Sequence, residues 1–172
     1  MGGGGNAVLT GFDGALRELI QSPKVARMAE YTQHGDTSCL LHCVAVAVYS
    51  QRLGRALGLR LREEALARGA LLHDYFLYDW HHSGRPGLVH AFGHPYFALE
   101  NARRDFALSA VEENIIVRHM FPMVPIPPRY KEGWLVTAVD KALSVYETFK
   151  KNAYGPLRRT YLGARENSGV AL

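Results

Sequence analysis

The chain has 172 residues, of which 48% are hydrophobic and 21% are charged. These values exclude a disordered chain and are typical of one globular domain with a substantial apolar core. The net charge of +4 is mildly basic. Because no dense run of lysine and arginine accompanies it, this charge favours a small anionic substrate over a dedicated nucleic-acid surface.

The cysteines and the apolar segments indicate the cellular compartment of the protein. The chain holds two cysteines, Cys39 and Cys43, which are too few for a disulfide scaffold. They lie four residues apart on one predicted helix, and we interpret them as small buried side chains. No cleavable signal pattern and no run of about 18 apolar residues is present. We therefore expect a cytoplasmic protein that does not associate with a membrane.

The first half of the chain is predicted to form two short helices, a polar loop and two longer helices. In this order they cover residues 14–21, 23–30, 31–38, 38–57 and 62–73. Asp36 or Thr37 is expected to cap the helix over 38–57. The apolar positions of that helix cover a broad face, which indicates a mostly buried helix, and Gly58 ends it.

The second half continues the helical pattern. Pro95 is expected at the first position of a helix that reaches about Phe106, after a breaker at 83–87. Ser109 and Glu112 form a capping box that opens a helix ending near His119. An extended loop, a long helix and a polar, basic tail follow, at residues 121–128, at 132–152 and from 155 on. Because no repeat, strand run or linker interrupts the helices, we predict an all-α, compact single-domain bundle.

The adjacent pair His73 and Asp74 closes an apolar helical run over residues 64–74. Desolvating an ionised carboxylate at such a place costs several kcal/mol unless a cation or hydrogen-bond donors compensate. A bound divalent metal would provide that compensation. The pair is therefore a candidate metal-ligating element.

Other residues of the right type are predicted in or next to the helices. They are His42, His94, His119 and Asp140. Asp140 is flanked by apolar residues on its helix, which argues against a solvated position, although an ion-paired core residue is an alternative. Bundle cores commonly build metal sites from facing helices. We interpret the remaining histidines as partly exposed or hydrogen-bonded residues, namely His81, His82 and His90.

This arrangement resembles the HD-domain superfamily of metal-dependent phosphohydrolases. The pattern there is a histidine in the first core helix, an adjacent His-Asp pair ending the next, and a later aspartate in a helix. Here these are His42, the pair His73 and Asp74, and Asp140. The resemblance covers about Tyr31 to Phe149. It implies an HD-type bundle, with a helical lead-in at 1–30, the HD domain at 31–152 and a tail at 153–172.

Two further histidines resemble the additional ligands of members with two metals. His94 matches a histidine near a helix start, and His119 matches a histidine one helix later. The resemblance implies that His42, His73, Asp74 and Asp140 hold one metal. Asp74 would bridge to a second metal held by His94 and His119. Imidazole and carboxylate ligands suit Mn, Fe, Co or Zn, so the expected cofactor is a pair of divalent transition-metal ions.

The implied activity is hydrolysis of a small phosphate ester or nucleotide by a metal-dependent phosphomonoesterase or phosphodiesterase. A metal-activated water would be the nucleophile, with Asp74 at the centre of catalysis. Lys141, beside Asp140, is a candidate for the rim of the site. His34, in the loop before the helix of His42, is a candidate phosphate ligand or general acid. Further candidates for binding the substrate, with solvated surface cations as the alternative, are Arg68, Arg118 and Lys131.

Departures from the pattern narrow the substrate. The Glu-Asp that follows the pair in guanosine-tetraphosphate hydrolases is absent, and so is the Gly-Tyr-Pro element of the cyclic-di-GMP members. The aromatic stretch Tyr75–His82 follows the pair, and either lines a base-stacking pocket or belongs to the core. Two alternatives stay open: an HD-fold mixed-valent di-iron oxygenase with the same ligands, and a non-catalytic metal-binding or sensing module.

Overall fold

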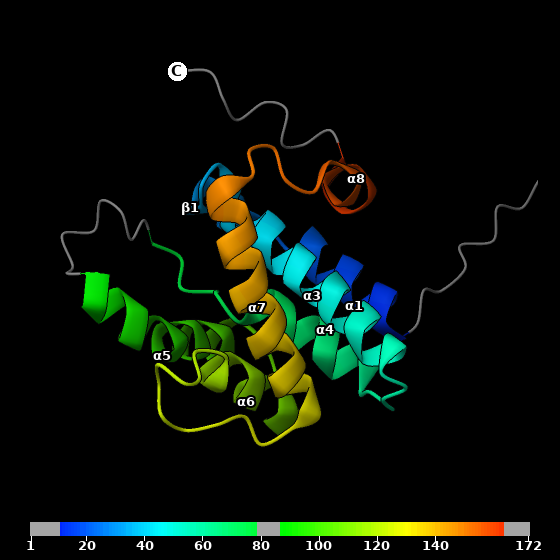
Figure 1. Cartoon of the computed structure of the whole chain (residues 1–172), viewed down its shortest axis with the longest axis vertical. Coiled ribbons are helices and arrows are strands. Elements are labelled where there is room, and N and C mark those ends of the chain that lie inside the picture. Colours follow the sequence, from blue (N-terminus) through cyan, green and yellow to red (C-terminus); the bar gives the residue numbers. More distant parts are fainter. Residues whose placement is uncertain (1–10, 79–86, 164–172) are drawn as a thin grey trace, which may run out of the picture.

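The computed structural model describes residues 11–78 and 87–163, with side chains for all of these except 87–91. This part of the chain is mostly helical (Figure 1). In chain order its elements are α1 (Gly11–Gln21), α2 (Pro23–Ala26), η1 (Arg27–Glu30), β1 (Thr32–His34), β2 (Thr37–Ser38), α3 (Cys39–Ala56), α4 (Glu63–Leu72), α5 (Gly87–Asp105), α6 (Ala110–Arg118), α7 (Lys131–Phe149), α8 (Gly155–Leu157) and η2 (Arg158–Leu162). The prediction of an all-α bundle is confirmed.

Helix α4 is the centre of the packing. It contacts α1, α3 and α6, while α7 contacts α3 and α6, and α5 packs on α6. Glu63 and Glu64 lie in the first turn of α4, where negative side chains interact favourably with the helix dipole and stabilise the helix. The leucines that follow, Leu66, Leu71 and Leu72, are fully buried. Burial of each contributes about 1.5–3 kcal/mol, so the apolar stretch fixes α4 among its neighbours and places its C-terminal end inside the bundle.

The caps of two helices test the sequence predictions. The capping box is confirmed: the Ser109 hydroxyl accepts from the Glu112 backbone N–H, and the Glu112 carboxylate accepts from the Ser109 backbone N–H. The predicted cap of α3 is wrong, because the Ser38 hydroxyl accepts from the Leu41 backbone N–H at 3.3 Å. Asp36 instead accepts from the backbone N–H of Asn152, at 3.0 and 3.2 Å.

The predicted polar loop at 31–38 is a small antiparallel hairpin. Strand β1 pairs with β2, with Thr32 opposite Ser38 and His34 opposite Thr37. Gly35 in the turn has a φ of +58°, and a Cβ there would lie 2.5 Å from the backbone oxygen of Glu147. The hairpin therefore rests directly against the C-terminal end of α7, which runs across the bundle in Figure 1. An isolated hairpin this short is marginally stable, so its formation depends on the contact with α7, which a local sequence pattern does not predict.

The predicted start of the fifth helix is wrong. Helix α5 begins at Gly87, so Pro95 lies inside it and His94 is not at a helix start. An interior proline removes one backbone hydrogen bond and costs about 3 kcal/mol in a helix. Helix α5 packs against α6, and tertiary packing of this kind routinely outweighs a local propensity cost.

The C-terminal segment is more ordered than its weak periodicity indicates. Helix α7 ends at Phe149, and α8 and a short π-helical turn, η2, follow. Leu157 and Leu162 are buried in the same hydrophobic core as Phe12 and Leu16 of α1. Within the described residues, no helix combines the length and apolar character needed to cross a membrane.

We predict that Gly35→Ala destabilises the fold more than Gly58→Ala does. Both glycines have positive φ, but a Cβ at Gly58 meets no atom within 4 Å. The control therefore measures the left-handed strain alone, which costs about 1–2 kcal/mol. The clash with Glu147 should add about 1–3 kcal/mol at Gly35. Urea unfolding of the two variants measures the difference, and equal losses would contradict the close hairpin–α7 contact.

Candidate metal centre

Five helices bring the six sequence-predicted ligands into one buried cluster. His42 lies in the first turn of α3, His73 and Asp74 follow the last turn of α4, and His94 is inside α5. His119 follows α6, and Asp140 lies in the middle of α7. All six are at most 6% exposed. The long apolar stretches of these helices thus deliver polar groups to an interior from which water is largely excluded.

One half of the cluster is built around Asp140. Its Oδ1 lies 3.2 Å from His42 Nε2 and 3.7 Å from His73 Nε2. Donor atoms of these three side chains lie within 4.8 Å of one another, a spacing that a single metal ion can span. Asp74 also contributes to this half through its Oδ2 atom, which lies 3.4 Å from His73 Nε2.

The other half is built around Asp74 Oδ1. This atom lies 3.2 Å from His94 Nε2 and 3.5 Å from His119 Nε2. Donor atoms of Asp74, His94 and His119 form a second group within 4.8 Å. The two oxygens of Asp74 therefore face different histidines. Both oxygens of this buried carboxylate thus have histidine nitrogens beside them.

The hydrogen bonds of His73 and His119 show that a cation fits the cluster. His73 Nδ1 lies 2.7 Å from the carbonyl oxygen of Ala70, and His119 Nδ1 lies 2.8 Å from that of Ile116. Nδ1 donates in both, so in the neutral rings Nε2 carries a lone pair. His73 Nε2 and Asp74 Oδ1 are fully buried without a hydrogen-bond partner. Burial lowers the pKa of His73, but the charge of Asp74 and a hydrogen bond to Asp140 outweigh it and raise that pKa well above its usual range, so the metal-free ring is protonated. A divalent metal can replace this proton, because in the neutral ring the Nε2 lone pair faces the carboxylate oxygens.

The electrostatics lead to the same conclusion. Burial lowers the pKa of His42, but hydrogen bonds to Asp140 and Glu147 outweigh burial and raise it to about 10. Burial, followed by repulsion from His73, lowers the pKa of His119 to about 3. Burial raises the pKa of Asp74, but the charges of His73 and His94 outweigh it and hold that pKa well below the usual range. The carboxylates are therefore ionised inside the bundle and require positive charge beside them.

One further carboxylate and one amide contact the cluster, and the sequence analysis did not anticipate either. The Glu147 carboxylate lies 3.0 Å from His42 Nδ1, and Gln33 Nε2 donates to Asp74 Oδ2 at 2.5 Å. Glu147 follows Asp140 by seven residues on α7, so both lie on one helix face, and this spacing was a usable signal. No sequence signal pointed to Gln33, because it reaches Asp74 only through the folding of the hairpin.

Both cysteines lie beside the same pair, and their predicted burial is confirmed. The Cys39 thiol donates to the Asp74 carbonyl oxygen at 3.4 Å. Cys43 has its sulfur within 4.8 Å of donor atoms of His73 and Asp74. Burial, followed by the neighbouring Cys39, raises the pKa of Cys43 well above its usual range, so the group is a neutral thiol.

Lys141 and His34 lie at the cluster. Lys141 Nζ donates to the carbonyl oxygen of His119 at 2.8 Å and lies 3.9 Å from Asp140 Oδ2. The His34 ring stands edge-on to that of His42, with centroids 5.5 Å apart. Burial, followed by repulsion from His42, lowers the pKa of His34. Both residues therefore lie beside the cluster, and the roles predicted for them stay predictions.

The three other predicted cations make no hydrogen bond or ion pair with the cluster among the described residues. Arg68 binds the Glu112 carboxylate at 3.0 Å and the Ala107 carbonyl oxygen at 2.8 Å, which ties α4 to the start of α6. Arg118 is the last residue of α6 and is partly exposed. Lys131 is exposed at the start of α7, nine residues or about 14 Å along the axis from Asp140. Their binding of substrate stays a prediction.

The aromatic stretch after Asp74 is core where the structure describes it. Tyr75 and Phe76 are buried, and the Phe76 ring stands edge-on to His94, with centroids 6.0 Å apart. Asn101 holds the stretch by donating to the carbonyl oxygens of Tyr75 and Phe76. Residues 79–82, with His81 and His82, lie outside the described residues, as does the side chain of His90.

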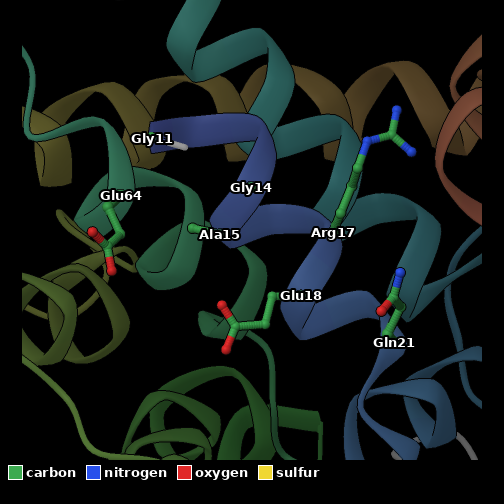
Figure 2. Close-up of a pocket in the computed structure, with 7 residues that line it drawn as sticks. All are labelled: Gly11, Gly14, Ala15, Arg17, Glu18, Gln21 and Glu64. Atoms are coloured by element: carbon green, nitrogen blue, oxygen red, sulfur yellow. The ribbon is translucent and has the colours of Figure 1, made fainter. Parts of the chain in front are cut away.

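A surface pocket between α1 and α4 is separate from the cluster (Figure 2). Figure 2 shows the guanidinium of Arg17 and the carboxylate of Glu18 pointing in different directions. The charged groups do not converge on one point, so this pocket lacks the character of a binding site. Its lining residues are Gly11, Gly14, Ala15, Arg17, Glu18, Gln21 and Glu64.

The fold and the cluster define a class: an all-α domain with a buried histidine–aspartate centre suited to divalent metal. The sequence profile of the HD domain family matches residues 40–143, a range that contains all six clustered residues. The chain belongs to the HD domain family. Members of that family are mostly metal-dependent phosphohydrolases, which makes this chain a member of a superfamily of metal-dependent hydrolase type. Comparisons with curated proteins and with solved structures give no significant match.

We predict that divalent metal raises the melting temperature of chelator-treated protein. A ligand that binds only the folded state at 100 times its Kd adds about 2.7 kcal/mol, or about 5–10 °C for a chain of this size. Asp74→Asn should remove most of this shift. Asp105→Asn is the control, because Asp105 is a mostly buried carboxylate that binds Lys24 and Tyr75 instead. Equal metal-induced shifts in both variants, measured by calorimetry, would place metal binding elsewhere.

Proposed function

We propose that this protein is a metal-dependent phosphohydrolase acting on a small phosphate ester or nucleotide. The observation that carries the proposal is the meeting of imidazole and carboxylate lone pairs in a buried cluster with two unpartnered atoms, His73 Nε2 and Asp74 Oδ1. Family membership supports this class of reaction. A small anionic substrate, which rests on the net charge, and a cytoplasmic location, which rests on the sequence patterns given above, are part of the same proposal.

The ligand assignment follows the two faces of Asp74. His42, His73 and Asp140 would hold one ion together with Asp74, and His94 and His119 would hold a second on the other Asp74 oxygen. Bound ions of this kind supply Lewis acidity and lower the pKa of water to about 7, which generates a nucleophile at neutral pH. The ligand chemistry suits Mn, Fe, Co or Zn.

The remaining groups orient the centre and meet the substrate. Asp74 is the proposed central catalytic carboxylate, and Lys141 is proposed to stabilise phosphoryl charge at the rim. Its contact with the His119 carbonyl oxygen holds it at the edge of the cluster. His34 has a lowered pKa, so its ring is neutral near pH 7 and suits hydrogen bonding to a phosphate better than protonating it. Arg68, Arg118 and Lys131 are proposed as outer substrate contacts.

A di-iron oxygenase is the second candidate, because four imidazoles and two carboxylates also suit iron. The ligands alone do not separate hydrolysis from oxygen chemistry. A non-catalytic metal-binding module is the third candidate. The presence of all six predicted ligands in one cluster favours a catalytic site over this third possibility.

We predict that protein loaded with Mn or Co releases phosphate from nucleotides or an aryl phosphate. Asp74→Ala should reduce kcat/KM at least 100-fold, the scale of loss seen when a group acting on the reacting phosphate is removed. Asp105→Ala is the control, with lower stability and near-normal kcat/KM. Phosphate release in a colorimetric assay measures both.

The outcomes separate the three candidates. Turnover with metal and its loss in Asp74→Ala support the phosphohydrolase. A metal-loaded protein inactive on a broad phosphoester panel contradicts it. Iron retained on purification, together with a mixed-valent signal in electron paramagnetic resonance, would identify the oxygenase. Full activity of Asp74→Ala would overturn the site assignment.

A further inference from the structure

Glu147 is a buried carboxylate whose partner is a member of the cluster. Its side chain is fully buried on α7, and both its oxygens lie 3.0 Å from His42 Nδ1. It lies outside residues 40–143, the range that the family profile covers. A buried carboxylate is destabilising unless it is well compensated, so its position requires an explanation.

The hydrogen bond fixes which nitrogen of His42 faces the cluster. With Nδ1 directed at Glu147, Nε2 is the nitrogen that faces the cluster, where Asp140 Oδ1 lies at 3.2 Å and Asp74 Oδ2 at 4.0 Å, and it is the nitrogen available to a metal ion. A carboxylate on the far nitrogen of a metal-binding imidazole holds the ring orientation and makes the near nitrogen more basic. We propose that Glu147 is a positioning residue that orients His42 for metal binding. This inference rests on the metal centre of the proposed function.

His42 is held differently from two other histidines of the cluster. His73 and His119 donate to carbonyl oxygens three residues earlier on their own helices. The acceptor of His42 is a carboxylate 105 residues away in sequence, on another helix. Hydrogen bonds to charged acceptors are shorter and stronger than those to neutral ones. Glu147 therefore supplies both a stronger bond and a link between α3 and α7.

The hairpin holds the backbone of Glu147 in place. Gly35 approaches the Glu147 carbonyl oxygen so closely that a Cβ would lie 2.5 Å from it. Asp36 accepts from the backbone N–H of Asn152, just beyond α7. The carboxylate is thus presented to His42 from a segment of α7 that the hairpin contacts both at Glu147 and just beyond the end of the helix.

Glu132 provides a matched comparison on the same helix. It is also fully buried, and it accepts from the Arg62 backbone N–H at 2.9 Å and lies 3.5 Å from the Arg62 guanidinium. Its partner does not belong to the cluster. Glu132 is therefore a structural ion-pair residue. If Glu147 were only structural, Glu147→Gln and Glu132→Gln would behave alike.

The test is the metal affinity of Glu147→Gln. Glutamine keeps the size and an acceptor oxygen but loses the charge. Titration of Zn²⁺ against a chromophoric chelator should show affinity reduced about 10–100-fold in Glu147→Gln and unchanged in Glu132→Gln. Unchanged affinity in Glu147→Gln, or equal losses in both variants, would overturn the inference.

A second measurement needs no variant of Glu147. In Zn-loaded wild-type protein, two-bond ¹⁵N–¹H spectra should show His42 protonated at Nδ1, with assignment by His42→Gln. A proton on Nε2 would overturn the inference even if Glu147→Gln fails to fold.

The proposed function fails separately. Protein that binds Zn²⁺ in the Glu147-dependent way but hydrolyses no phosphate ester upholds the positioning role and contradicts the phosphohydrolase. Wild-type protein that binds no divalent metal contradicts both.

Discussion

The structure depends on the ionised carboxylate of Asp74 in the interior of a helical bundle. Desolvating such a charge costs several kcal/mol, and the fold surrounds it with compensating groups. His73 Nε2 faces one oxygen, and His94 Nε2 faces the other. The amide of Gln33 donates to the carboxylate, and the Cys39 thiol donates to the backbone carbonyl of the same residue. The hairpin, α3, the end of α4 and α5 therefore all contribute groups that meet at Asp74.

The rest of the architecture follows from holding these groups together. Helix α4 packs against α1, α3 and α6, and this packing places the pair His73 and Asp74 at its C-terminal end inside the bundle. Helix α7 crosses the bundle and contributes Asp140, with Lys141 bound to the carbonyl oxygen of His119 at the end of α6. The hairpin rests on the end of α7 and reaches Asp74 through Gln33. Packing and polar contacts thus support the same site.

The cluster defines a metal centre more closely than it defines a reaction. Imidazole and carboxylate ligands are compatible with several transition metals and with both hydrolytic and oxygen chemistry. What distinguishes reactions is the set of groups around the substrate. Lys141 and His34 are the groups proposed for this role beside the cluster, and both have a pKa lowered chiefly by burial. Arg68 is engaged with Glu112, so its guanidinium already has a partner outside the centre.

The sequence by itself determined the helices and the residue types of the site. The periodicity of apolar residues and the Ser109–Glu112 capping box depend on residues close together in the chain, so the sequence is enough to identify them. A His-Asp pair is unusual at the end of an apolar helical stretch, so the sequence also identifies this pair as a candidate site. Local signals failed for the start of α5, where Pro95 was expected to begin the helix.

Only the tertiary structure decided which atoms meet. It divided the two oxygens of Asp74 between different histidines, and it brought Gln33 and Glu147 to the cluster from segments 41 and 105 residues away from their partners. Such contacts depend on how helices pack, and packing is set by the whole core rather than by a local pattern. The hairpin over 32–38 has the same origin, because its turn is stabilised by α7. The sequence specified the ligands, and the packing of the helices specified their geometry.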